Sequence, residues 1–132
     1  MKQGKGFSGN LYQVTNIRKE SGGKAEVVIR LNREHKIFGG HFPGNPVLPG
    51  ACTVQIIKET IEAVTDQLLL LSDAPVIKFQ SFVNPEINND LDIDLTISRG
   101  EGGRLICSAV VRREDITFCS FRGTFRPVDE AH

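Results

Sequence analysis

The sequence predicts an α+β fold in which one long helix packs against one curved antiparallel sheet. Two observations predict it. Apolar and polar residues tend to alternate through most of the chain, as in strands with one buried face, and the period changes to that of a helix in one long segment. A single helix can cover the buried face of such a sheet, so this is the most economical way to close a core.

The first half of the chain contains a predicted hairpin and the predicted helix. Apolar residues tend to alternate from Leu11 to Ile17 and from Ala25 to Leu31, and Ser21-Gly22-Gly23 between them is a turn sequence. From Ala51 to about Leu71 the apolar residues follow a helical period, which predicts an amphipathic or fully buried helix. The apolar stripe of this helix consists of Val54, Ile57, Ile61, Val64 and Leu68.

Four further strands are predicted after the helix, over residues 76–83, 91–97, 105–111 and 116–125. Short polar turns separate the later ones, which favours pairing between neighbours in the chain. We therefore expect these four strands to form an antiparallel meander. The turn sequences are Asn88-Asn89-Asp90, Gly100-Glu101-Gly102-Gly103 and Arg113-Glu114-Asp115.

Length and composition indicate one globular domain. The chain has 132 residues, of which we expect residues 1–10 to form a flexible lead-in and residues 11–132 a single domain. No apolar run approaches the roughly 20 residues of a membrane span, and no signal peptide is visible, so we expect a cytoplasmic location. The 16 basic and 16 acidic residues cancel, so neither nucleic acid nor a membrane is an expected partner.

The three cysteines, Cys52, Cys107 and Cys119, are odd in number, far apart and set in apolar patterns. That distribution favours buried free thiols over disulfides or a zinc cluster. We expect no metal site.

The segment from His41 to Gly50 is the candidate functional site. It reads HFPGNPVLPG, and its three prolines and two glycines constrain the path of the backbone that carries the histidine. Pro49 and Gly50 stand where a helix usually has a side-chain cap, which leaves backbone N–H groups of the first turn free to bind a ligand oxygen. The sequence therefore predicts a rigid loop that presents His41 for chemistry.

This segment resembles the signature His-Phe-Pro-x-x-Pro-Val-Met-Pro-Gly of the hotdog-fold 3-hydroxyacyl-acyl carrier protein dehydratases, the FabZ and FabA type, with Leu48 for the methionine. The resemblance implies a hotdog fold and a dimer whose two sheets join, with active sites at the interface. It also implies acyl thioester substrates on acyl carrier protein or coenzyme A, and no metal or organic cofactor. Hexamers, or heterodimers with a related dehydratase, are alternative assemblies.

The resemblance also implies roles for individual residues. His41 would be the base, the Gly50 amide would bind the thioester oxygen, and the residue fourteen positions after His41 would be a catalytic acid from the other subunit. That residue here is Gln55, which can orient a hydroxyl group but has no titratable proton. Loss of a general acid slows a reaction by about 10² to 10⁴-fold. The residues expected to line the substrate site are Phe42, Val47, Leu48, Pro49 and Ala51.

Three routes could replace the missing acid. His41 could return its proton to the leaving hydroxyl, Glu59 or Glu62 could substitute, or a partner subunit could supply an acid. Glu59 lies one helical turn, about 5.4 Å, beyond Gln55, which is far for direct substitution. We therefore favour His41 alone or a partner's acid, and expect Glu59 and Glu62 on a solvated helix face.

The predicted function is dehydration of 3-hydroxyacyl thioesters in fatty acid or related acyl-chain synthesis. Two alternatives remain open: a non-catalytic hotdog subunit that binds acyl thioesters or stabilises an active partner, and a hotdog thioesterase. A basic cluster is either a polar strand face or an attraction site for an acidic carrier protein; it consists of Arg112, Arg113, Arg122 and Arg126. The phenylalanines expected in the core or in a dimer interface are Phe79, Phe82, Phe118, Phe121 and Phe125.

Overall fold

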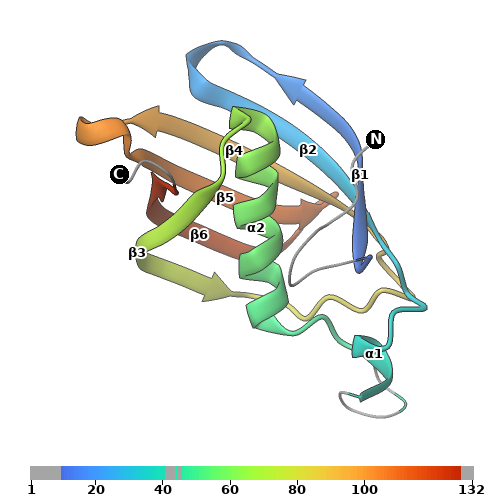
Figure 1. The fold of residues 1–132 in the computed structure, drawn as a ribbon. Coiled ribbons are helices and arrows are strands. Elements are labelled where there is room, and N and C mark those ends of the chain that lie inside the picture. The colour runs from blue at the N-terminus through green and yellow to red at the C-terminus, as the bar shows by residue number, and fades with distance from the viewer. Residues whose placement is uncertain (1–9, 41–43, 45, 129–132) are drawn as a thin grey trace.

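The computed structural model describes residues 10–40, 44 and 46–128. An antiparallel six-stranded sheet curves around the long helix α2 (Gly50–Thr65), as the sequence predicts for an α+β hotdog fold (Figure 1). The strands lie in the order β1-β2-β4-β5-β6-β3. They are β1 (Tyr12–Lys19), β2 (Lys24–Leu31), β3 (Leu69–Phe79), β4 (Asp90–Arg99), β5 (Leu105–Arg113) and β6 (Ile116–Pro127).

The predicted N-terminal hairpin is confirmed. β1 pairs with β2 in antiparallel register, and the turn between them is a short 3₁₀ segment, Ser21–Gly23. Gly22 and Gly23 have φ angles of 76° and 77°, a left-handed conformation that favours glycine. A side chain on Gly23 would also collide with the carbonyl group of Ile97. Both glycines are therefore required by the backbone of the turn.

Helix α2 is shorter than predicted. It ends at Thr65, and Asp66 takes a left-handed conformation (φ 58°, ψ 42°) as its N–H donates to the Glu62 carbonyl at 2.8 Å. The expected helix end near Leu71 is wrong because the leucine run pairs with β6 as a strand. Leu68, predicted to be on the buried stripe, is 71% exposed and lies beyond the helix.

The predicted four-strand meander is also wrong. Only β4, β5 and β6 follow one another in the sheet, while β3 pairs with β6 at the far edge and β4 pairs with β2. The reason is the position of α2, which follows β2 and precedes β3 in the chain. The helix runs across the face of the sheet, so β3 starts at the opposite edge from the β1–β2 hairpin (Figure 1). Segment 80–89 then passes the start of the helix on its way to β4 (Figure 1).

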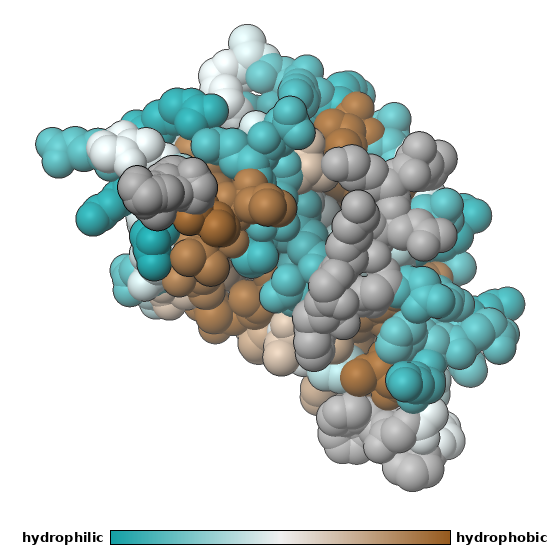
Figure 2. All heavy atoms as spheres, in the orientation of Figure 1, coloured by the Kyte–Doolittle hydropathy of each residue, from teal (hydrophilic) through white to brown (hydrophobic). Residues whose placement is uncertain are grey.

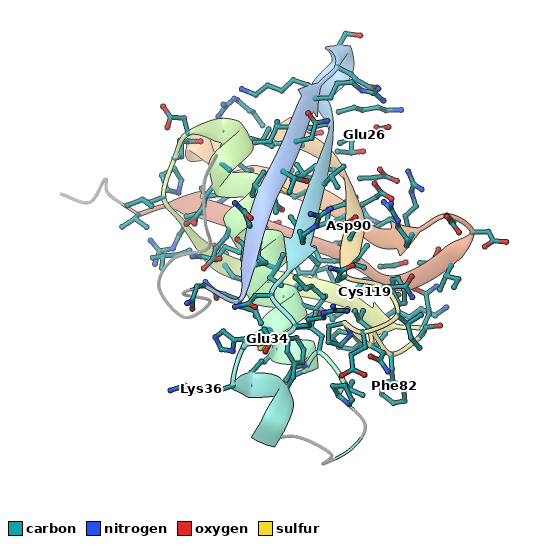
Figure 3. All side chains as sticks on the ribbon, turned by 90° about the vertical axis from the view of Figure 1, so that its right-hand side faces the viewer. Glu26, Glu34, Lys36, Phe82, Asp90 and Cys119 are labelled. Atoms are coloured by element: carbon teal, nitrogen blue, oxygen red, sulfur yellow. The ribbon has the colours of Figure 1, made fainter. Side chains whose placement is uncertain are left out.

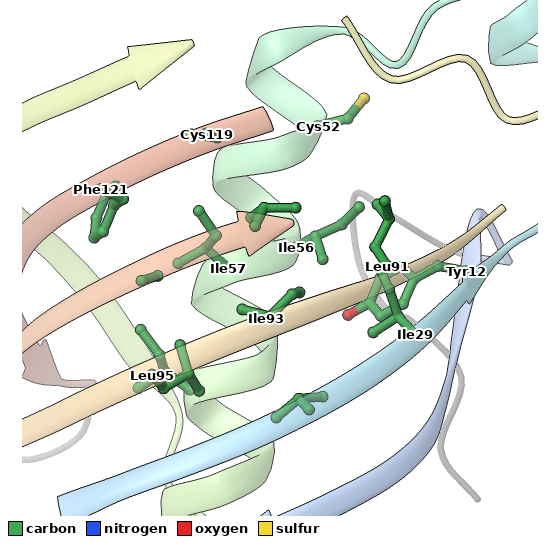
Figure 4. Packing of buried hydrophobic residues seen from close by; sticks show 14 of the residues in the cluster. Tyr12, Ile29, Cys52, Ile56, Ile57, Leu91, Ile93, Leu95, Cys119 and Phe121 are labelled. Carbon is green, nitrogen blue, oxygen red and sulfur yellow. The ribbon is translucent and has the colours of Figure 1, made fainter. Parts of the chain in front are cut away.

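The core lies between the concave face of the sheet and one face of α2. Alternate residues of β2, β4 and β5 are buried, as their sequence period predicts. They form one buried cluster with Ile56, Ile57 and Ile61 of the helix, and Figure 4 shows Ile56 and Ile57 within it. The predicted stripe is rotated, because Val54 and Val64 are only partly buried and Thr53 and Thr60 take buried positions. The Thr60 hydroxyl satisfies its hydrogen bond by donating to the Ile57 carbonyl at 2.8 Å.

The outer face of the sheet carries paired charges. Arg112 lies 2.6 Å from Asp94, and Arg113 lies 3.1 Å from Asp92, each across neighbouring strands. Glu26 and Asp90 lie on the same outer side, seen in Figure 3. Because Arg112 and Arg113 already have carboxylate partners, half of the predicted basic cluster is neutralised.

Candidate active site

The predicted loop is described only in its second half. His41 and Phe42, the expected base and a substrate-contacting residue, lie outside the described residues, as do Pro43 and Asn45. Residues 46–49 have no regular secondary structure, and the Leu48 N–H donates to the Val83 carbonyl at 2.9 Å. This bond ties the loop to the segment that follows β3, so two stretches distant in sequence meet at the start of α2.

Helix α2 begins without a side-chain cap, as Pro49-Gly50 predicts. The Pro49 carbonyl accepts from the N–H groups of Cys52 and Thr53 at 3.0 and 3.2 Å. In the part of the chain that the structure describes, the N–H groups of Gly50 and Ala51 have no acceptor. They form the positive end of the helix dipole and are able to bind an anionic or partly negative oxygen.

A cavity of about 310 Å³ lies beside Gly50. Of the residues expected at the substrate site, Val47, Leu48 and Pro49 line this cavity, together with Gly50, whereas Ala51 is exposed and does not line it. The loop motif could not reveal the other residues that line the cavity, which are Thr53, Phe79, Ser81, Phe82, Val83, Phe118 and Cys119.

The aromatic side chains divide between core and cavity. Phe121 and Phe125 are buried together, with ring centroids 5.9 Å apart, as the core prediction requires. Phe79 and Phe82 are 53% and 82% exposed and border the cavity, with Phe82 at the outer surface in Figure 3. The cavity is therefore mainly apolar, with an aromatic rim.

Gln55 lies in a second cluster. Its Nε2 donates to Glu59 Oε2 at 2.9 Å, and the Tyr12 hydroxyl donates to Glu59 Oε1 at 2.7 Å. Burial, followed by the hydrogen bond and charge of Glu59, raises the pKa of Tyr12 far above its usual range, so the phenol keeps its proton. These three side chains link α2 to β1.

The expectation that Glu59 and Glu62 lie on a solvated face is wrong. Both carboxylates are partly buried, Glu59 under Tyr12 and Glu62 between the Lys58 ammonium at 3.1 Å and the Leu69 N–H at 2.8 Å. Glu59 lies one helical turn beyond Gln55, and their two side chains together reach across this turn and form the hydrogen bond between them.

The predicted site residues thus form two groups within one chain. Gly50 faces the cavity, but Gln55 is five residues further along α2, which rotates it by about 140° around the helix axis. Gln55 does not line the cavity. A single chain therefore does not bring the Gly50 amide and the Gln55 amide to the same face.

The thiols are unsuited to nucleophilic chemistry. All three cysteines are free and buried, as predicted. Burial raises the pKa of Cys119, which lines the cavity, and of Cys52 at the start of the helix. Thiols held in the neutral form are poor nucleophiles. Within residues 10–40, 44 and 46–128, no three potential metal ligands cluster.

Comparison with known proteins identifies the family. The family model described as ApeI-like, ApeI dehydratase, matches residues 17–120. The chain belongs to the ApeI-like dehydratases. This membership agrees with the resemblance of the HFPGNPVLPG segment to the FabZ and FabA signature.

Curated relatives of this ApeI-like chain are 3-hydroxyacyl-[acyl-carrier-protein] dehydratases named FabZ. The one from Lactococcus lactis is 32% identical over 112 residues, covering 78% of this chain and 70% of the relative. The one from Lactobacillus helveticus is 34% identical over 107 residues, covering 74% and 68%.

Solved structures support the fold of this ApeI-like chain. A chain of the dehydratase heterocomplex ApeI:P from Xenorhabdus doucetiae aligns with a TM-score of 0.66 at 20% identity, over 86% of this chain and 96% of that one. An uncharacterized protein from Pyrococcus horikoshii aligns with a TM-score of 0.65 at 15% identity, over 89% and 85%. No helix within the described ranges has the length and apolar character needed to cross a membrane.

Proposed function

We propose that this chain dehydrates 3-hydroxyacyl thioesters, carried on acyl carrier protein or coenzyme A, in fatty acid or related acyl-chain synthesis. One observation carries the proposal. The end of the HFPGNPVLPG segment forms one wall of an apolar cavity, and this wall includes Gly50, whose N–H has no acceptor among the described residues. The FabZ relatives are 3-hydroxyacyl-[acyl-carrier-protein] dehydratases, which supports this substrate class.

The proposed reaction needs one base and one oxygen-binding site. Neutral His41 removes the proton from the carbon next to the thioester carbonyl, and the Gly50 N–H hydrogen-bonds the carbonyl oxygen as it gains negative charge. The carbon–oxygen bond of the 3-hydroxyl then breaks, and the protonated His41 returns its proton to the departing oxygen. The products are an enoyl thioester and water, and the base is regenerated.

Gln55 has a binding role in this scheme. It cannot supply a proton, but its amide can hydrogen-bond the 3-hydroxyl and hold it in line for departure. The return of the proton by His41 replaces the acid that FabZ-type sequences carry at this position. We therefore expect slower turnover than with a carboxylic acid at position 55.

A two-subunit site reconciles the separated positions of Gly50 and Gln55. We propose a homodimer in which Gln55 of one subunit completes the cavity of the other. β3 is an edge strand with exposed apolar side chains. Such an edge is a typical site of association with another protein chain. Figure 2 shows hydrophobic side chains gathered over β3. The exposed apolar residues of this strand include Leu70, Leu71, Val76, Ile77 and Phe79.

A non-catalytic subunit is the second candidate function. The observation in its favour is Gln55 itself, because a chain without the family acid could serve to stabilise an active partner. The related structure from Xenorhabdus doucetiae is the dehydratase heterocomplex ApeI:P, which supports an association of this kind. In either role, Arg122 and Arg126, which have no carboxylate partner within the described residues, are available to an acidic carrier protein.

The deciding experiment follows the ultraviolet absorbance of the enoyl thioester as it forms from a 3-hydroxyacyl thioester. The purified chain should be active, and His41→Ala should reduce kcat by about 10²-fold or more. Activity that survives His41→Ala would refute the mechanism. An inert chain that gains activity only when mixed with a related dehydratase would favour the non-catalytic subunit.

A further inference from the structure

The contact between Gln55 and Glu59 fixes the orientation of the glutamine amide. Both oxygens of Glu59 act as acceptors, Oε1 from Tyr12 at 2.7 Å and Oε2 from Gln55 at 2.9 Å. A carboxylate has no hydrogen to donate, so only the NH₂ group of Gln55 can face it. The amide oxygen of Gln55 must then point away from Glu59.

Tyr12 holds Glu59 in place for this contact. The Tyr12 side chain is 3% exposed, and its hydroxyl reaches Glu59 across 47 positions of sequence. The phenol is a permanent donor, because its pKa lies far above the working pH of a protein. Glu59 therefore has one hydrogen bond from β1 and one from its own helix.

No neighbouring acid competes for Gln55 among the described residues. Glu62, the next carboxylate along α2, is occupied by the Lys58 ammonium and the Leu69 N–H. The amide orientation of Gln55 therefore depends on Glu59 alone, and Glu62 is a matched control in the same helix.

We propose that Glu59 is a positioning residue that turns the Gln55 oxygen toward the substrate, so that Gln55 selects 3-hydroxyacyl over 3-oxoacyl thioesters. This inference rests on the proposed function. A 3-hydroxyl group has a hydrogen to donate to the amide oxygen, whereas a 3-oxo group has only lone pairs and meets the same oxygen with like partial charge. A site built to accept a substrate hydrogen discriminates against an analogue that lacks one.

The test measures the affinity of 3-hydroxyoctanoyl-pantetheine and 3-oxooctanoyl-pantetheine by calorimetry. A His41→Ala background prevents turnover during the titration. We expect the 3-hydroxy thioester to bind about tenfold tighter, the effect of one hydrogen bond. Adding Glu59→Gln should reduce this preference to below about threefold, because an amide at position 59 can donate or accept and leaves Gln55 free to take either orientation. Adding Glu62→Gln should leave the preference unchanged.

The outcomes separate this inference from the proposed function. If the 3-hydroxy thioester binds but the preference is absent, or is equal with and without Glu59→Gln, the inference fails and the proposed function stands. If neither thioester binds, both fail. A uniform loss of affinity for the two thioesters in Glu59→Gln would indicate a merely structural role and would also overturn the inference.

A second measurement needs no change at Glu59. In ¹⁵N-labelled protein, the side-chain NH₂ signals of Gln55 are identified by their loss in Gln55→Ala. Their exchange with solvent should be about tenfold slower or more than that of the exposed Gln13 amide. Equal exchange rates for Gln55 and Gln13 would show that Glu59 does not hold the amide.

Discussion

The ring of Phe79 lies directly against Gly50, so that a Cβ built on the glycine would come within 2.9 Å of the ring's Cζ atom. The strand that ends at Phe79 and the helix that starts at Gly50 therefore meet at the cavity. The absence of a side chain at position 50 lets the aromatic ring approach the first-turn N–H groups. This contact leads to the first prediction.

Gly50→Ala should reduce kcat/KM for a 3-hydroxyacyl thioester by about 10-fold to 100-fold, because the methyl group displaces Phe79 and crowds the oxygen-binding N–H. Stability should change by less than about 1 kcal/mol, since alanine favours helix and Phe79 is exposed enough to move. Steady-state kinetics and thermal unfolding measure the two effects. Gly100→Ala, at a glycine distant from the cavity, is the control. Unchanged kinetics in Gly50→Ala would argue against oxygen binding at this amide.

Tyr12→Phe should lower the free energy of unfolding by about 1 to 3 kcal/mol. The substitution removes the 2.7 Å hydrogen bond and leaves a partly buried oxygen of Glu59 without its donor. Urea denaturation measures the difference. Thr15→Val removes an exposed hydroxyl from the same strand and should change stability by less than about 0.5 kcal/mol. Equal effects of the two substitutions would contradict the structural role of Tyr12.

Stability should fall at high pH because of Tyr12. The folded-state pKa is raised, so the unfolded chain loses the phenolic proton first, at about pH 10. The stabilisation is complete below that pH, and above it the free energy of unfolding should decrease by about 1.4 kcal/mol per pH unit from this group. Tyr12 is the single tyrosine of the chain, so tyrosinate absorbance reports on it alone. Tyrosinate that forms in the native protein at about pH 10 would disprove the prediction.

Cys107 should react with a disulfide reagent only after unfolding. Burial raises the pKa of its thiol to about 11, and its side chain is inaccessible within β5. Near neutral pH the native protein should therefore react very slowly, whereas the protein in denaturant should release signal for three thiols. Cys107→Ser removes one of the three reactive thiols, so the signal that it loses belongs to Cys107. Rapid labelling of Cys107 in the native state would show that this part of the sheet opens readily.

Gln55→Glu should raise kcat by about 10-fold or more. The new carboxyl lies beside Glu59, and like charges at this distance raise the pKa of the pair, so that a proton is retained for the leaving hydroxyl. The double variant Gln55→Glu/Glu59→Gln keeps one carboxyl and one amide in contact. It should show a smaller gain, because the charge repulsion is absent. A loss of activity in Gln55→Glu would mean that position 55 does not meet the leaving group.

The sequence predicted those features of the site that depend only on residues adjacent in the chain. Pro49-Gly50 predicts an uncapped helix start, and the structure has one. The sequence could not predict the contact of Glu59 with Tyr12, because it joins positions 47 residues apart. Helical spacing places Glu59 one turn beyond Gln55, too far to take over the position of the acid directly, but it does not show whether the two side chains contact each other. Their hydrogen bond is seen only in the structure.

The sequence by itself determined the repeat of apolar and polar residues within each strand and helix. Alternating apolar residues specified the buried faces of β2, β4 and β5, because a strand turns successive side chains to opposite faces. The tertiary structure decided the end of α2, the place of β3 at the sheet edge, and the cavity between Gly50 and Phe79. The physical reason is that a leucine run such as 68–71 suits a helix or a strand equally well, and only its pairing with β6 selects the strand.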